Sequence, residues 1–345
     1  KDRGIRENAH PDYRSQQGCA EKDCYDVYEN GNCIAHNSLK SVHIMKSKAK
    51  RFLLNQLPLN SSMSSEFSAF WRFIIELVEN KKFGSYRLLE RIAKGGLATI
   101  WLASGSGGEV VALRVMHDNF RTGSSGPKLF RRGCEVMESL PGHPNIVRFI
   151  SKGKEKGHEF IVIEYIEGCC LREMMVRKDS RLDEILSDIV VELAAALEHL
   201  HDNGFMHLDI KPENLIISRG GTSCLCDFDT AHLIPDKPAK VEKKSGTPFY
   251  MSPELMNGWK FDHRADIYAF GVTIYELLTG VKPFEGQTQK AMLANQLNQR
   301  YRIRELRNFN SNIPIKLDEL IIKCLNFIPE KRPPNMTILA REIHR

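Results

Sequence analysis

The hydrophobic pattern of this chain changes its period once, near residue 171, and that change limits the folds that the chain can adopt. From Tyr86 onward, short runs such as YRLLERI, EVVALRVM and FIVIEYI have the length and the side chains typical of β-strands. One helical stretch, from Lys128 to Leu140, interrupts them. Beyond residue 171, long runs with helical spacing predominate, for example LDEILSDIVVELAAALEHLHDNG. The pattern therefore predicts two lobes of different class, joined near Glu167 and Gly168, with a cleft between them.

The first 83 residues differ in composition from the rest of the chain. Residues 1–65 are polar and show little periodicity, so we interpret them as an irregular N-terminal extension. Residues 66–83 carry apolar side chains at helical spacing, which predicts an amphipathic helix and a linker. This helix is expected to pack on the lobe that follows it, and a docking face for a partner is the alternative. Residues 84–345 are predicted to form one domain, with a smaller lobe at about 84–167 and a larger lobe at about 168–345.

Composition and charge exclude two classes of function. The net charge is +6, but lysines and arginines alternate with acidic residues along most of the chain, without the basic stripe of a nucleic-acid-binding protein. We therefore expect no nucleic acid among its partners. No apolar run reaches the roughly 18 residues that cross a bilayer, and the first residues lack the apolar core of a secretory signal. The expected location is cytoplasmic, without a membrane span.

The nine cysteines of the chain fall into two groups. Six lie inside strand-like or helix-like patterns of the predicted domain, as the reduced thiols of an intracellular enzyme do. The other three lie in the N-terminal extension, where they and two of its histidines could be metal ligands. Their spacings, C-x4-C and C-x8-C, are not a strong zinc motif, so loose surface thiols are the favoured interpretation. The candidate ligands are Cys19, Cys24, Cys33, His36 and His43.

Four polar motifs follow one another through the second predicted lobe. They are HLDIKPENL at 207–215, CDFDTA at 226–231, GTPFYMSPE at 246–254 and DIYAFG at 266–271. A turn with paired glycines in the sequence GGLAT precedes them, and glycines let backbone N–H groups approach phosphate oxygens closely. In this order the motifs resemble the protein kinase superfamily, and GGLAT with GTPFYMSPE resembles its bacterial serine/threonine branch. The resemblance implies an α+β bilobal kinase fold, with a small β-rich N-lobe containing one main helix and a larger α-helical C-lobe.

The resemblance also implies a reaction, the transfer of the γ-phosphate of ATP, bound with Mg²⁺, to a hydroxyl of a protein substrate. Within HLDIKPEN, Asp209 corresponds to the base that orients the substrate hydroxyl, and Lys211 to the cation on the transferred phosphate. Asn214 and Asp227 correspond to the metal ligands. Thr247 corresponds to the residue that braces the catalytic aspartate and lysine in kinases of the serine/threonine type. Singly, aspartate and asparagine are also common turn residues, but their joint spacing favours the catalytic interpretation.

The nucleotide site is implied by the same resemblance. The strand FIVIEYIEG is similar to the hinge of a kinase, with Ile163 as gatekeeper and with the Glu164 carbonyl and the Ile166 amide facing the adenine. Taken singly, the apolar residues of this site would be ordinary core residues. The predicted ATP-binding residues are Ile92, Lys94, Gly95, Gly96, Ile100, Ala112, Arg114, Ile163, Glu164, Ile166, Ile216 and Cys226.

The chain departs from the kinase pattern at positions that bear on activity. Arg114 stands where the family has the strand-three lysine, and a planar guanidinium cannot make the same point contact with the α- and β-phosphates. The glutamate of the following helix falls on Gly133, and Glu135 lies roughly 200° around the helix from it. Either the helix is shifted or the ion pair between this glutamate and the strand-three cation is missing. Asp229 replaces the glycine of Asp-Phe-Gly. We expect Arg114 to serve as a catalytic cation in an active kinase. A pseudokinase that binds a nucleotide or a partner as a scaffold, without phosphoryl transfer, is the alternative.

Overall fold

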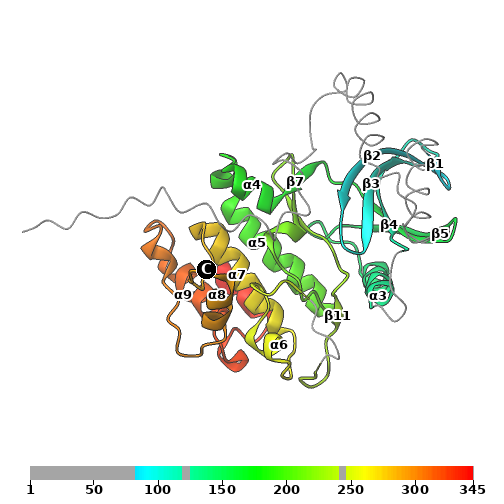
Figure 1. Cartoon of the computed structure of the whole chain (residues 1–345). Helices are drawn as coiled ribbons and strands as arrows, with labels where there is room; N and C mark the ends of the chain where they lie inside the picture. The colour runs from blue at the N-terminus through cyan, green and yellow to red at the C-terminus, as the bar shows by residue number, and fades with distance from the viewer. Residues whose placement is uncertain (1–81, 119–124, 241–245, 345) are drawn as a thin grey trace, which may run out of the picture.

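The computed structural model describes residues 82–118, 125–240 and 246–344. Figure 1 shows a β-rich lobe at the right and a helical lobe at the left, which confirms the predicted α+β architecture. The predicted N-terminal extension, its candidate metal ligands and nearly all of the predicted amphipathic helix lie outside the described residues. At the end of the predicted linker, two residues form a short strand, β1 (Lys82–Phe83).

The smaller lobe contains a six-stranded antiparallel sheet in the order β1-β2-β3-β4-β6-β5. The residues of the central strand β4 alternate between two apolar clusters, with Leu113 in one and Ala112 in the other. Helix α3 (Gly126–Ser139) contributes Phe130 to the cluster that contains Ala112. The remaining strands are β2 (Tyr86–Lys94), β3 (Ala98–Ser104), β4 (Val110–Met116), β5 (Phe149–Glu155) and β6 (His158–Glu164).

The larger lobe is built on two long helices, α5 (Leu182–Asp202) and α7 (Arg264–Thr279). Every residue of α7 from Ala265 to Leu277 is buried, which requires neighbours on all sides of that helix. The other helices are α4 (Leu171–Arg177), α6 (Pro253–Asn257), α8 (Gln289–Gln296), α9 (Ile315–Cys324) and α10 (Met336–Ile343). Short 3-10 turns are η1 (Pro212–Asn214), η2 (Leu306–Asn308) and η3 (Pro329–Lys331).

Within the described ranges, we find no helix with both the length and the apolar character needed to cross a membrane.

Short strands at the junction of the lobes carry the polar motifs. Strands β7 (Gly168–Cys170), β9 (Leu215–Ser218) and β10 (Ser223–Leu225) form one sheet, and β8 (Phe205–Met206) pairs with β11 (His232–Leu233). Because β9 and β10 form an antiparallel hairpin, the loop before β9 and the segment after β10 lie side by side. The Cys226 amide donates to the Asn214 carbonyl at 2.9 Å. The motifs at 207–215 and 226–231 are therefore brought together by this hairpin.

Candidate active site

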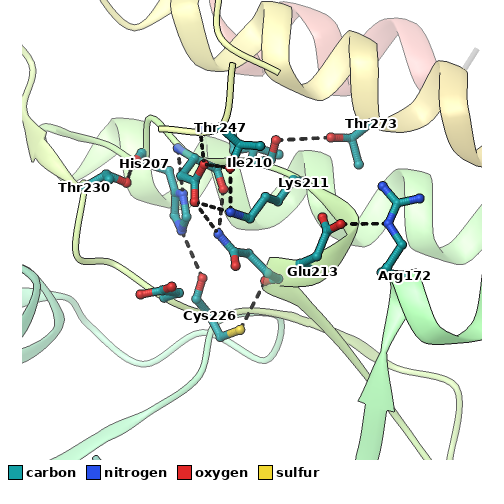
Figure 2. Close-up of polar contacts among 12 residues, drawn as sticks. Arg172, His207, Ile210, Lys211, Glu213, Cys226, Thr230, Thr247 and Thr273 are labelled. Carbon is teal, nitrogen blue, oxygen red and sulfur yellow. Dashed lines mark hydrogen bonds and ion pairs between the residues drawn. The ribbon is translucent and has the colours of Figure 1, made fainter. Parts of the chain in front are cut away.

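In the loop between β8 and β9, residues 207–214, the side chains of Lys211 and Asn214 both contact the Asp209 carboxylate. Lys211 Nζ lies 2.7 Å from Asp209 Oδ2 and 2.6 Å from Thr247 Oγ1. Thr247 donates to Asp209 Oδ1 from its amide and from its hydroxyl, each at 2.9 Å. Figure 2 shows Lys211 and Thr247 pointing toward each other from separate segments of the chain. The carboxylate of Asp209 is thus fixed in orientation before any substrate binds.

The environment of Asp209 also sets its charge. Burial alone would raise the pKa of this carboxyl group. The positive charge of Lys211 and the hydrogen bonds from Lys211 and Thr247 outweigh burial, so the pKa of Asp209 lies below its ordinary value. Asp209 is therefore ionised at neutral pH.

His207 and Asp266 hold the backbone of this loop. Asp266 accepts the amide of His207 at 2.7 Å and the amide of Leu208 at 2.8 Å. Leu208 has a φ of 65°, which is unfavourable for a branched side chain, and these hydrogen bonds stabilise it there. His207 Nδ1 accepts from the Asp209 amide at 3.3 Å, so its proton lies on Nε2, which donates to the Cys226 carbonyl at 3.1 Å. Sequence reasoning missed this role of His207, although the residue opens the HLDIKPEN motif.

Two side-chain oxygens near Asp209 and Arg114, those of Asn214 and Asp227, could hold a metal ion. Asn214 donates from Nδ2 to the Asp209 backbone carbonyl at 2.7 Å, so Oδ1 is its acceptor atom for another group. The Asp227 side chain is 43% exposed, and its Oδ1 lies 3.3 Å from Arg114 Nη2. The described ranges contain no group of three or more histidine, cysteine or acidic side chains arranged to bind a metal. A cation held here by Asn214 and Asp227 would take its other ligands from phosphates and water.

Arg114 lies in β4 with its guanidinium buried between the lobes. Its Nη2 donates to Asp229 Oδ2 at 2.8 Å and to Asp227 Oδ1 at 3.3 Å. The guanidinium carbon lies 5.6 Å from the ring centroid of Phe130, within the range of a cation–π contact. Burial alone would lower the pKa of Arg114, but Asp229 and Asp227 raise it above the ordinary value. The side chain therefore carries a permanent positive charge in the cleft.

Arg114 forms an ion pair, but not with helix α3, so the family's pair between strand and helix is missing, as one of the two expectations from the sequence states. Gly133 is buried on the side of α3 that faces the backbone of Phe228 and Asp229, and Glu135 is exposed. The ion pair exists, but its carboxylate belongs to Asp229. The helix cannot carry it at position 133, because a Cβ there would lie 2.8 Å from the Phe228 carbonyl oxygen.

The strand register places three of the residues predicted around the adenine on one face of the sheet, together with Arg114. Ile100 pairs with Arg114, and Ala112 pairs with Ile163, so these four side chains share a face. Ile92 differs, since it lies at a β-bulge in β2 and is 41% exposed. Its place over the adenine does not follow from the register.

The glycine turn between β2 and β3 also differs from the expectation. The Gly95 amide donates to the Ala98 carbonyl at 2.9 Å and closes the hairpin, so it is already used within the turn. Gly96 is exposed, and no atom lies within 4 Å of the position that a Cβ would take there. Lys94 is exposed at the end of β2. Of the two glycines, Gly96 is therefore the one whose amide is not used to close the turn.

The remaining predicted nucleotide residues lie around the junction of the lobes. Glu164 ends β6, and Ile166 follows it, half-buried. Ile216 is half-buried in β9 and pairs with Cys224. Cys226 Sγ donates to the Asn214 carbonyl at 3.3 Å, and burial raises the pKa of this thiol. Cys226 is therefore protonated and unreactive at neutral pH.

Comparisons with known proteins agree with this geometry. The protein kinase domain family matches residues 86–343. A probable serine/threonine-protein kinase of Clostridium perfringens, CPE1738, is 30% identical over 260 residues, which are 75% of this chain and 37% of that protein. PrkC of Bacillus subtilis, a serine/threonine-protein kinase, is 29% identical over 250 residues, which are 72% of this chain and 38% of that protein. An Aurora kinase of Eremothecium gossypii is 28% identical over 283 residues, 82% of this chain and 75% of that protein.

The chain spans less than two fifths of the length of these bacterial relatives, 37% and 38%. The match nevertheless covers both lobes and every motif described above. This chain therefore belongs to the protein kinase family, and it is of the bacterial serine/threonine type.

Proposed function

We propose that this chain is an active kinase that transfers the γ-phosphate of ATP to a serine or threonine hydroxyl of a protein. The observation that carries the proposal is the Asp209 carboxylate, which Lys211 and Thr247 hold ionised and in one orientation. A preorganised charge next to the attacking group needs no reorganisation during the reaction, which is usually the largest source of catalysis. Protein kinases in general use ATP and Mg²⁺, and act on protein substrates.

The residues of the cleft fit Mg²⁺ and the phosphates of ATP. Asn214 Oδ1 and the partly exposed carboxylate of Asp227 are the oxygen ligands that Mg²⁺ prefers. Arg114 Nε is buried and has no hydrogen-bond partner among the described residues. Because an unpaired buried N–H group is costly, a phosphate oxygen at this nitrogen would stabilise the site. When bound, the metal ion would neutralise charge on the phosphates, and Arg114 would add a second positive charge there.

We call the loop of residues 207–214, between β8 and β9, the catalytic loop. Its side chains suggest which groups receive the proton and stabilise the negative charge during phosphoryl transfer. The substrate oxygen bonds to the γ-phosphorus as the bond between that phosphorus and the β,γ-bridging oxygen breaks. Asp209 orients the attacking hydroxyl and receives its proton, late in the reaction because the pKa of Asp209 is low. Lys211 lies next to Asp209 and stabilises the negative charge of the transferred group. Thr247 keeps both side chains in place.

The pseudokinase alternative depends on three departures from the family pattern, Arg114, Gly133 and Asp229. In the structure these three residues lie next to one another. Arg114 pairs with Asp229, and Gly133 leaves room for the backbone next to Asp229. Together these three residues place a buried, paired cation at the junction of the lobes, where the phosphates are proposed to bind. Nothing in the described part of the chain favours loss of phosphoryl transfer over its retention.

Binding of Mg·ATP by the full 345-residue chain tests the first step of the proposal. A ligand that binds only the native state stabilises it, by about 2.7 kcal/mol at a concentration 100 times its Kd. We expect the midpoint of thermal unfolding to rise with ATP plus Mg²⁺, and to rise less in Asp227→Ala. A folded wild-type protein that shows no rise at millimolar ATP and Mg²⁺ would contradict the proposal.

A further inference from the structure

The carboxylate that pairs with Arg114 belongs to the segment 226–231. Asp229 Oδ2 lies 2.8 Å from Arg114 Nη2, and the two side chains are only 12% and 9% exposed. The removal of one partner from such a buried pair leaves an uncompensated charge, so the two side chains depend strongly on each other. Asp227 lies farther from Nη2, at 3.3 Å, and its side chain is 43% exposed. Of the two carboxylates, Asp229 therefore restrains the guanidinium more strongly.

Helix α3 contributes no carboxylate to Arg114. Its two acidic residues are Glu135, which is exposed, and Glu138, which pairs with Lys152 at 2.5 Å. What the helix offers to Arg114 is the ring of Phe130. A rotation of α3 about its axis would therefore not remove the negative charge that orients the guanidinium.

Gly133 allows α3 to approach the segment that carries Asp229. A Cβ at position 133 would lie 2.8 Å from the Phe228 carbonyl oxygen and 3.0 Å from the Asp229 Cα. Both are backbone atoms, which cannot give way as a flexible side chain would, so any larger residue would displace the helix. Asp229 lies outside the left-handed region of backbone conformations, so its own side chain needs no strained φ angle.

We propose that Asp229 is a positioning residue that orients Arg114 toward the phosphates of the nucleotide, and that Gly133 is its steric complement. The carboxylate is supplied by the segment that also contains the metal ligand Asp227, so one segment orients both positive charges of the site. The inference rests on the proposed function, because the nucleotide phosphates are the groups that Arg114 is proposed to bind.

The coupling between the two side chains can be measured without nucleotide, by urea unfolding of the full chain. We expect Asp229→Asn to lower the unfolding midpoint clearly when Arg114 is present, because the buried guanidinium then loses the closer of its two carboxylates and keeps only Asp227, at 3.3 Å. In the Arg114→Met background Asp229 has already lost its partner, so the same change should not lower the midpoint and should raise it if Asp229 is ionised there. Glu135→Gln is the matched control. It should shift the unfolding midpoint only slightly, and by the same amount in the wild-type and Arg114→Met backgrounds. Equal shifts for Asp229→Asn in the two backgrounds would overturn the assignment.

Steady-state kinetics with ATP separate positioning from simple support of the fold. Asp229→Asn should lower kcat/KM for ATP about tenfold to a hundredfold, as loss of a group that orients a ligand-binding side chain does, with a raised KM. Glu135→Gln should leave both constants unchanged. A folded Asp229→Asn variant with wild-type KM and kcat would refute the positioning role. If the wild-type chain neither binds nor uses ATP, the proposed function fails, while the unfolding cycle still decides whether Asp229 restrains Arg114.

The steric half of the inference has its own variant. Gly133→Ala should reduce kcat/KM for ATP, because α3 must move away from the Phe228 carbonyl. In the double variant with Asp229→Asn, Gly133→Ala should lower kcat/KM for ATP little further. The pairing of Asp229 with Arg114, which Gly133→Ala disturbs, is already lost in Asp229→Asn. Wild-type kinetics in Gly133→Ala, or effects of the two changes that simply multiply, would contradict the pairing of Gly133 with Asp229.

Discussion

The Arg114 side chain has three kinds of neighbour, and each restricts its guanidinium differently. Strand β4 sets its position next to Ile100, and the ring of Phe130 covers it at 5.6 Å. Asp229 and Asp227 accept hydrogen bonds from the same nitrogen, Nη2. Nε has no partner among the described residues, which leaves a donor for a ligand. A planar group with several donors can be held by protein carboxylates and still bind a phosphate, which a single ammonium does less well.

Replacement of Arg114 by alanine should lower phosphoryl transfer by about a hundredfold, the range for loss of one preorganised charge. Arg114→Lys should keep transfer within about tenfold of wild type, because the charge remains although the fork geometry is lost. Initial rates of the three proteins are compared, with Asp209→Asn as the blank. Wild-type rates in Arg114→Ala would disprove the role of this residue, and Lys94 would be the next cation to test.

At the scale of elements, helix α7 connects the catalytic loop to the core of the C-lobe. Asp266, in its first turn, accepts the amides of His207 and Leu208 and pairs with His201 Nε2 at 2.9 Å. Burial alone would raise the pKa of Asp266, but the hydrogen bonds from His201 and the His207 amide lower it below the ordinary value of 3.8. The ionised carboxylate therefore stabilises the folded state, and the buried helix fixes the loop that contains Asp209.

Asp266→Asn should lower the free energy of unfolding at pH 7 by about 2–3 kcal/mol, the upper range for hydrogen bonds to a charged group. The sign of the pH dependence follows from the lowered pKa. The contribution of Asp266 is complete above its ordinary value of 3.8 and is lost as the pH falls through the lower folded value. Urea unfolding should therefore give a constant difference from wild type between pH 5 and 7 that shrinks below about pH 4. A difference that grows toward low pH would contradict this account of Asp266.

A second pair joins elements within the C-lobe. Arg332, after η3, donates to both carboxylate oxygens of Glu254 in α6, at 2.6 and 2.8 Å, and both residues are buried. Arg332 also lies over the ring of Tyr268 in α7, 4.9 Å from its centroid. Three elements that are distant in sequence therefore meet at one guanidinium.

Arg332→Ala should destabilise the fold by about 3–5 kcal/mol, because Glu254 is then left buried and unpaired. The matched control is Arg304→Ala, which breaks the exposed pair between Arg304 and Glu285 and should cost less than about 1 kcal/mol. Both values come from urea unfolding at one pH. Similar losses of unfolding free energy in the two variants would contradict the larger contribution expected of the buried pair.

At the scale of the whole molecule, the two lobes and the catalytic loop could be predicted from the sequence because their information is local. The change from strand-like to helical periodicity lies in short windows, and Asp209, Lys211 and Asn214 lie within one motif. The pairing of Arg114 with Asp229 could not be predicted, since the residues are 115 positions apart and meet only after folding. The available clue was the joint departure of positions 133 and 229 from the kinase pattern, which sequence reasoning treated separately.

Two further differences between prediction and structure come from the way in which strands β2 and β3 pair. The bulge at Ile92 and the use of the Gly95 amide within its own turn depend on strand pairing, which composition does not reveal. The predicted cytoplasmic location and the absence of nucleic acid among the partners remain predictions.

Phosphoryl transfer by the purified full chain tests the central claim most directly. Radiolabelled ATP and Mg²⁺ are incubated with wild type or Asp209→Asn and a protein acceptor such as casein, and the labelled amino acids are then identified. We predict label on serine or threonine with the wild type, and a rate at background with Asp209→Asn, whose side chain cannot accept the hydroxyl proton. A folded wild type that binds Mg·ATP but transfers no more label than Asp209→Asn would contradict the account.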